Sequence, residues 1–248
     1  MKRALALLLL LLPFAAFAQE PDYSAWNRIL STYYDPARGM DYKALKARDA
    51  KALQTLRQQL GKVNVAALTP KAQLAYWINV YNVNVVATIV ERYPVESIKD
   101  LSTDPIIRLN VFKKARVPFG KELLSLDDVE HKKIREGFKD PRIHFAANCA
   151  ARSCPPIRPE AYVGNRVDAQ LDDQARKFLA GAKVERDGDE LTITTTKIMD
   201  WYGEDFEKWA GGQAAFLRKY LPARVFTGVN DIDIEYDDYD WSLNDWRR

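Results

Sequence analysis

One segment decides how the rest of the chain is arranged: residues 69–93 read TPKAQLAYWINVYNVNVVATIVERY. Thr69 is a favourable N-cap for a helix, and Pro70 suits the first helical position. Pro94 disfavours helix at the residue before it and so ends the helix there. Between these ends the segment is apolar nearly all round, and such a helix belongs in the interior of a fold. We therefore expect a long central helix over residues 71–93.

Amphipathic segments surround this predicted helix. Apolar side chains at helical spacing predict further helices over residues 22–34, 43–60, 126–138, 167–179, 205–209 and 213–221. Strands are predicted over residues 142–149, 184–196 and 232–236, the second being a hairpin that turns at Asp187-Gly188. Because internal repeats and linker-like runs are absent, we expect one α+β domain. It would be mostly helical, built around the central apolar helix, with a small, partly antiparallel sheet.

Residues 1–18 are predicted to be a cleavable signal peptide. Lys2 and Arg3 precede an apolar run, and small residues such as Ala16 and Ala18 flank the expected cleavage site. The run is shorter than the roughly 20 residues that span a bilayer, and no later segment is apolar enough. We expect a mature chain of residues 19–248 that forms one globular domain in the bacterial periplasm and does not span the membrane.

Composition excludes few functions. The 37 basic residues nearly balance the 34 acidic ones, and no basic stripe is interleaved with aromatic residues, so no nucleic-acid partner is expected. The two histidines lack zinc-ligand spacing, and the acidic run at residues 237–240 lacks the glycine and glutamate of a calcium loop. We therefore expect no metal and no cofactor. The partner would be a small-molecule or peptide ligand, or another envelope protein.

Both cysteines lie in the segment DPRIHFAANCAARSCPPI, residues 140–157. An even number of cysteines in an exported protein predicts a disulfide between Cys149 and Cys154, which would close a very small loop. A redox-active pair is a second interpretation. Thiol oxidoreductases favour two intervening residues, however, and this pair has four.

The third interpretation makes Cys149 a nucleophile, with His144 or His131 as the base. Arg142 and Arg152 are close enough in sequence to lower the pKa of the thiol. On a regular strand His144 and Cys149 would point to opposite faces, unless a turn begins at Asn148. No histidine follows Cys149, so the base must precede the nucleophile in the chain.

Three further polar residues are candidates for a site. Glu130 falls within the apolar stripe of its predicted helix, where it could act as a general acid or base, orient a histidine, or pair with Arg142 or Arg135. Asn79 and Asn82 lie three apart on the central helix and must be hydrogen-bonded if buried. They could tie the helix to loop backbone, including the Cys149 segment, or act as oxyanion donors or orienting amides.

Several of these segments together resemble one family, the domain of unknown function 547 family, over almost the whole mature chain. The resemblance rests on residues 75–82 (AYWINVYN), 93–98 (YPVESI), 125–131 (SLDDVEH), 140–149 (DPRIHFAANC), 153–156 (SCPP) and 239–244 (YDWSLN). It implies a shared architecture for these motifs, and it implies no activity, substrate or cofactor.

Two functions compete on this evidence. The first is a disulfide-stapled binding or accessory domain of the cell envelope. The alternative is a cysteine-dependent hydrolase or acyl transferase, for which peptide cross-links of the cell wall would be natural substrates in that compartment. A hydrolase centred on the carboxylate of Glu130 is a third hypothesis. The state of Cys149 distinguishes the first two, because a cysteine locked in a disulfide cannot act as a nucleophile.

Overall fold

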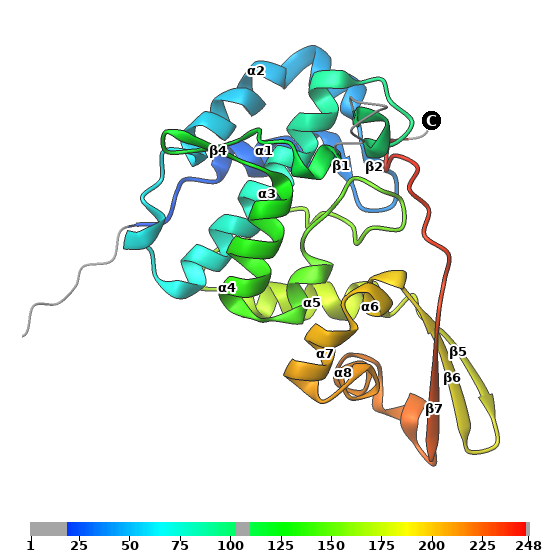
Figure 1. Ribbon diagram of the computed structural model, residues 1–248. Helices are drawn as coiled ribbons and strands as arrows, with labels where there is room; N and C mark the ends of the chain where they lie inside the picture. Colours follow the sequence, from blue (N-terminus) through cyan, green and yellow to red (C-terminus); the bar gives the residue numbers. More distant parts are fainter. Residues whose placement is uncertain (1–18, 103–109, 247–248) are drawn as a thin grey trace, which may run out of the picture.

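The computed structural model describes residues 19–102 and 110–246 and has more helix than strand, the predicted α+β class (Figure 1). The α-helices are α1 (Ser24–Tyr33), α2 (Tyr42–Leu60), α3 (Pro70–Arg92), α4 (Glu136–Phe138), α5 (Val167–Leu179), α6 (Lys197–Trp201), α7 (Gly203–Ala210) and α8 (Gln213–Tyr220). Short 3-10 helices are η1 (Val65–Ala67), η2 (Ile98–Leu101), η3 (Val111–Lys113), η5 (Pro141–Phe145) and η6 (Ala223–Phe226). The predicted signal peptide lies outside the described residues.

Helix α3 lies at the centre of the helical part, as its apolar sequence predicts. The Thr69 side chain caps it by accepting a hydrogen bond from the Ala72 N–H at 3.3 Å, and Pro70 occupies its first turn. Every residue from Leu74 to Val90 is buried. Helix α2 packs on α3, helix α1 packs on α2, and α5 also contacts α3. Burial on all sides is what an apolar helix with no polar face requires.

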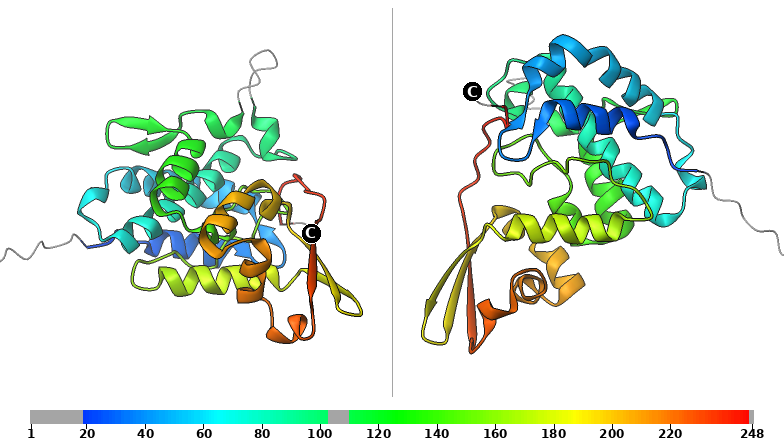
Figure 2. Two further views of the ribbon diagram at one scale, coloured as in Figure 1. Left: turned by 60° about the horizontal axis from the view of Figure 1, so that its bottom comes forward. Right: turned by 180° about the vertical axis from the view of Figure 1, so that it is seen from behind.

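The strands form three small sheets. The first two are two-stranded and antiparallel: β1 (Tyr34–Asp35) with β2 (Gly39–Met40), and β3 (Val117–Phe119) with β4 (Glu122–Leu124). The third has the order β5 (Lys183–Asp187), β6 (Glu190–Thr195), β7 (Asp231–Tyr236), with β5–β6 antiparallel and β6–β7 parallel. This sheet extends away from the helices (Figures 1 and 2). Its hairpin turns one residue later than predicted, because Asp187 pairs with Glu190 and Gly188 takes the positive φ of 60°.

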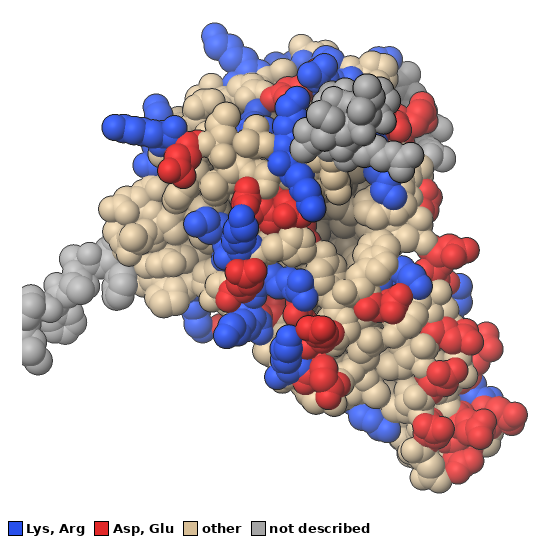
Figure 3. All heavy atoms as spheres, in the orientation of Figure 1, with Lys and Arg blue, Asp and Glu red and all other residues tan. Residues whose placement is uncertain are grey.

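A second apolar cluster joins the sheet to the helices of the C-terminal part. Alternate residues of β6 are buried, and Leu191 and Ile193 pack in the same cluster as Phe145, Phe206 and Phe216. Strand β7 carries three acidic residues, Asp231, Asp233 and Glu235, and on the face drawn in Figure 3 Asp and Glu side chains gather over the end of the sheet. Within the described ranges, no helix is long and apolar enough to cross a membrane.

Two predicted elements differ in the structure. The strand predicted over residues 142–149 is wrong: η5 occupies its first half, because the Asp140 carboxylate accepts the Arg142 N–H at 3.0 Å and Pro141 starts a helical turn. The helix predicted over residues 126–138 contains the π-helix η4 (Asp128–Arg135), followed by α4. Its wider turn is shown by the Glu136 N–H, which donates to the carbonyl of His131. Such π-turns are rare and occur frequently at functional sites.

Candidate functional site

Central helix α3 holds the loop that carries both cysteines. Asn82 uses both atoms of its buried amide: Nδ2 donates to the carbonyl of Ala146 at 2.9 Å, and Oδ1 accepts the N–H of Asn148 at 2.8 Å. Asn79 forms the same pair of bonds with the backbone of Tyr162, at 2.8 and 3.0 Å. The hypothesis that these asparagines tie the helix to loop backbone is therefore confirmed. With both amides engaged in this way, neither lines the cavity described below.

The backbone around Cys149 is held in a conformation that an L-residue rarely adopts. Ala150 has a φ of +63°, in the left-handed region, and is fully buried. The buried Asn148 side chain supports this turn, since its Oδ1 accepts the Ala150 N–H at 2.9 Å and its Nδ2 donates to the carbonyl of Pro155 at 2.7 Å. Strain of this kind persists only where surrounding bonds enforce it, and it concentrates at functional sites.

The two cysteines are free thiols, so the structure does not contain the predicted disulfide. Their sulfurs take part in hydrogen bonds instead: the Cys149 N–H donates to Sγ of Cys154 at 2.9 Å, and the Cys154 thiol lies 3.7 Å from the carbonyl of Ala147. The Tyr239 hydroxyl lies 3.2 Å from Sγ of Cys149. Cys149 is half-buried, whereas Cys154 is buried. A free, partly accessible thiol is the state that the nucleophile hypothesis requires.

The hydrogen bonds at Cys149 favour its thiolate. Burial opposes ionisation, but bonds from the Cys154 thiol, the Tyr239 hydroxyl and the backbone of Ala151 outweigh it and lower the pKa of Cys149. Burial and the neighbouring Cys149 raise the pKa of Cys154 well above its usual range. The pair therefore loses its first proton at Cys149. Arg142 and Arg152, the cations predicted to lower this pKa, are not among these groups.

His144 is fixed by an acid that sequence reasoning missed. Its Nε2 lies 2.8 Å from Oδ2 of Asp205, and its ring stacks on Tyr202 with 3.8 Å between ring centroids. Burial lowers the pKa of His144, and Asp205 only partly opposes this. Burial alone would raise the pKa of Asp205, but bonds from His144 and Arg135 hold it well below its usual range. The imidazole is thus neutral near pH 7, and with Nε2–H donated to Asp205, Nδ1 can accept a proton.

This histidine should make stability depend on pH. Because the pKa of folded His144 is below the unfolded value of about 6.5, the unfolded state binds more protons as pH falls through that value. The free energy of unfolding should therefore decrease from pH 7.5 to pH 5.5 in urea titrations, and less steeply in His144→Gln. His131→Gln, which changes the half-exposed histidine, is the matched control. Equal pH dependence in wild type and His144→Gln would contradict the prediction.

Glu130 bonds with tyrosines rather than with the arginines considered for it. Its Oε1 accepts the Tyr202 hydroxyl at 2.8 Å, and the Tyr81 hydroxyl also donates to this carboxylate. Tyr202 thus contacts both Glu130 and His144. His131 lies on the same π-helix, with Nε2 3.7 Å from Oδ1 of Asp127.

The arginines of the sequence hypotheses bind elsewhere. Arg135 forms two bonds to Asp205, at 2.6 and 3.0 Å. Arg142 is buried and pairs with three aspartates, and Nη2 of Arg152 donates to the carbonyl of Asp245 at 3.4 Å. Glu130 therefore does not pair with Arg135 or Arg142, the alternative considered for it, and neither Arg142 nor Arg152 lines the cavity described below.

One cavity of about 280 Å³ brings the reactive groups together. Cys149, Cys154, His144, His131 and Glu130 all line it, so His144 and Cys149 do not point to opposite faces of a strand, the arrangement that a regular strand would have given. Its other lining residues are Tyr81, Asn110, Phe112, Asp127, Ala147, Ile198, Trp201, Tyr202, Tyr239 and Trp241. Asn79, Asn82, Asn148, Arg142 and Arg152 lie outside this lining. All four residues predicted to be catalytic therefore line the cavity, whereas the five predicted to orient the site or bind a ligand do not.

The C-terminal segment completes the cavity. It runs beside the cysteine loop, where the Arg152 N–H donates to the carbonyl of Ser242 at 2.9 Å and the Asn244 N–H donates to the carbonyl of Ala150 at 2.9 Å (Figure 1). This backbone pairing positions Tyr239 and Trp241 so that both line the cavity. Residues 239–244 are among the motifs quoted above, which is the one sequence signal that could have identified Tyr239.

The family assignment concerns the part of the chain that builds most of this site. Residues 65–179 match the model of the family described as "Protein of unknown function, DUF547". A DUF547 domain lies there. The DUF547 match includes α3, the π-helix, the cysteine loop and α5, and it excludes Asp205 and Tyr239. No curated protein and no solved structure matches the chain.

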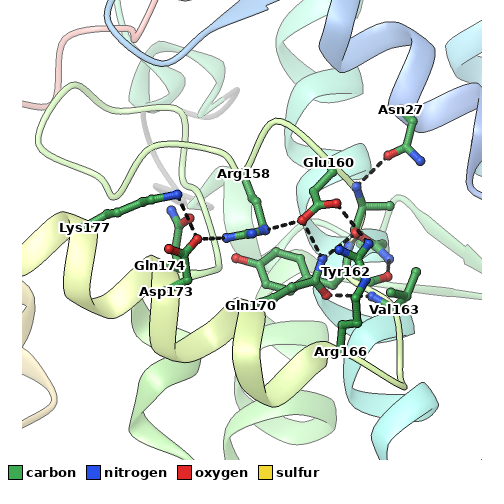
Figure 4. A network of polar contacts seen from close by, with 12 residues as sticks. Asn27, Arg158, Glu160, Tyr162, Val163, Arg166, Gln170, Asp173, Gln174 and Lys177 are labelled. Carbon is green, nitrogen blue, oxygen red and sulfur yellow. Dashed lines mark hydrogen bonds and ion pairs between the residues drawn. The ribbon is translucent and has the colours of Figure 1, made fainter.

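A polar network anchors the DUF547 segment that follows Cys154 (Figure 4). Arg158 bonds with Glu160 at 2.9 Å and with Asp173 on α5 at 2.5 Å. Gln170 donates to Glu160 and to the carbonyl of Ala161. The network ties residues 158–163, which follow the cysteine loop in the chain, to α5. Within residues 19–102 and 110–246, no group of three or more His, Cys, Asp or Glu side chains is arranged to hold a metal ion.

Proposed function

We propose that this protein is a cysteine-dependent hydrolase or acyl transferase, with Cys149 as the nucleophile and His144 as the base. One observation carries the proposal: a free thiol with a lowered pKa lines the same cavity as a histidine whose Nε2 is fixed by a carboxylate. Asp205 is the positioning residue of that histidine. The signal peptide predicted over residues 1–18 would direct this activity to the periplasm.

The reaction follows from these roles. Nδ1 of His144 takes the thiol proton of Cys149, and the sulfur attacks the carbonyl carbon of an amide or ester, moving an electron pair to the carbonyl oxygen. When the carbonyl re-forms, the bond to the leaving group breaks and His144 returns the proton to that group. Water, or another acceptor, then gives its proton to His144 and attacks the thioester carbonyl; when the carbonyl re-forms, the carbon–sulfur bond breaks and the Cys149 sulfur takes the proton back from His144.

The donor to the developing oxyanion is the Tyr239 hydroxyl in this proposal. Of the backbone amides after Cys149, the Ala150 N–H bonds to Asn148 and the Arg152 N–H bonds to Ser242, whereas the backbone of Ala151 bonds to the Cys149 sulfur and can donate alongside Tyr239. Tyr239 already contacts the sulfur at 3.2 Å. Once the sulfur is bonded to carbon it loses its negative charge, so the hydroxyl is free to bond to the nearby oxyanion.

Tyr239→Phe tests this contact. Losing the hydroxyl removes a bond to the thiolate, so the pKa of Cys149 should rise. Alkylation of Cys149 by iodoacetamide at pH 7 should slow by about tenfold, the factor that corresponds to ~1.4 kcal/mol. Tyr236→Phe is the matched control, because its hydroxyl bonds to Gln213 away from the cavity. An unchanged pH profile of alkylation in Tyr239→Phe would remove Tyr239 from the mechanism.

The proposal itself is tested by alkylating the reduced wild-type protein over a range of pH and locating the label by peptide mass. Cys149 should react at pH 7 and Cys154 should not react until the protein is denatured. His144→Gln should leave a reactive thiol but no turnover of amide and ester substrates. The proposal fails if Cys149 reacts only at the pH of an ordinary thiol, or if both cysteines form a disulfide in the protein isolated from its native compartment.

The binding-domain hypothesis keeps its support from the aromatic lining of the cavity, but it no longer has a disulfide as its basis. The Glu130-centred hydrolase is less favoured, because the hydroxyls of Tyr202 and Tyr81 already bond to that carboxylate.

A further inference from the structure

The charged side chains that line the cavity are acidic. Among the residues that the structure describes, its lining contains two carboxylates, Asp127 and Glu130, and no lysine or arginine. Asp127 lies 3.7 Å from Nε2 of His131. In the part of the chain that the structure describes, Glu130 forms no salt bridge, and the neighbouring His144 is kept neutral by burial. A partly buried carboxylate without a counter-charge is costly, and a cation entering the cavity would remove that cost.

Aromatic rings form the wall beside these carboxylates. Trp201, Tyr239 and Trp241 pack on one another, with ring centroids 4.6 to 5.9 Å apart. Trp201 is 46% exposed, which is unusual for so large an apolar side chain. The cluster already binds one ammonium group: Nζ of Lys99 lies 3.6 Å from the ring centroid of Trp241. Aromatic faces attract ammonium groups and are used in this way to recognise cationic ligands.

We propose that the cavity recognises an ammonium group on its substrate, with Glu130 as the counter-charge and the Trp201–Tyr239–Trp241 cluster as the aromatic wall. The substrate class is then an amide or peptide that carries an amino group near the bond that Cys149 attacks. A carboxylate at the same place would be repelled by Glu130 and Asp127. The inference rests on the proposed function only in calling the ligand a substrate, since ammonium binding itself needs no catalysis.

Binding is measured on Cys149→Ser, which cannot turn over or be alkylated at that position. The probes are three five-carbon compounds: 1,5-diaminopentane, 1,5-pentanediol and glutarate. Tryptophan fluorescence reports binding because Trp201 and Trp241 line the cavity. The diamine should bind at least about tenfold more tightly than the diol, which corresponds to ~1.4 kcal/mol, and glutarate should bind more weakly than either.

Adding Glu130→Gln should abolish the preference for the diamine. Glu136→Gln, an exposed carboxylate on the adjacent α4 and outside the cavity lining, should leave the preference intact. Trp201→Leu, at the exposed edge of the cluster, should weaken diamine binding without the risk of unfolding that a buried change carries. Equal affinity for diamine and diol, or a preference that survives Glu130→Gln, would overturn the inference. Either result would leave the alkylation test of Cys149 unaffected, so the two proposals fail separately.

Discussion

Cys149→Ala should abolish thiol-dependent turnover and the alkylation seen at pH 7, while leaving the protein folded. Removing a covalent nucleophile costs at least about a thousandfold in rate, because no other group can form the acyl intermediate. The free energy of unfolding should change by only about 1 kcal/mol, since the side chain is small and half-buried. The measurements are turnover of an amide and ester panel, labelling rate, and urea unfolding.

Cys154→Ser is the matched control for this variant. Its thiol donates to the sulfur of Cys149, and a hydroxyl can take over that role, so most of the activity should remain. The alkylation profile of Cys149 should shift only modestly. If both cysteine variants instead lose stability equally and neither changes an activity, the pair has a structural role, and the disulfide-stapled domain regains support.

The sequence was most informative where a local pattern and burial agree. The apolar run of α3 predicted both a helix and its central position, and α5 begins and ends at Val167 and Leu179, the residues that its amphipathic pattern indicated. These elements follow from spacing alone, because side chains three and four positions apart share a helix face. The predicted reactive residues, Cys149 and His144, also line one cavity.

What could not be predicted depends on contacts between distant parts of the chain. Asp205 reaches His144 across 61 positions, and Tyr239 reaches Cys149 across 90. The chain has many aspartates and twelve tyrosines, and no local pattern singles out Asp205 or Tyr239 among them. The strand predicted over residues 142–149 was wrong because the small and apolar residues there suit a strand, whereas Asp140 and Pro141 start a helical turn. The pairing predicted for Glu130 failed because each arginine nearby has aspartates of its own.

Arg142→Met should be the most destabilising of the substitutions considered. The guanidinium is buried at the start of the cysteine loop and bonds to Asp140 at 2.6 Å, Asp168 at 3.1 Å and Asp172 at 3.0 Å. Removing one partner from a buried ion-pair network costs about 3–5 kcal/mol. Because Asp168 and Asp172 are partly exposed, we expect the lower end of that range in urea unfolding.

The same variant separates stability from chemistry. Hydrogen bonds from Lys71 and Arg142 lower the pKa of Asp168. Burial would raise the pKa of Asp172, but hydrogen bonds from Tyr220 and Arg142 outweigh burial and lower it. These carboxylates therefore stabilise the fold fully above the unfolded value of about 3.9, and the contribution is lost as pH falls through their lower folded values. In Arg142→Met the free energy of unfolding should fall less steeply as the pH is lowered below about 4. The control Arg176→Met, which changes an exposed residue on α5, should keep the wild-type pH dependence. Because Arg142 lies outside the cavity, Cys149 in the folded variant should alkylate at the wild-type rate. Slower alkylation in a variant shown to be folded would mean that Arg142 acts on the thiol, as the sequence first suggested.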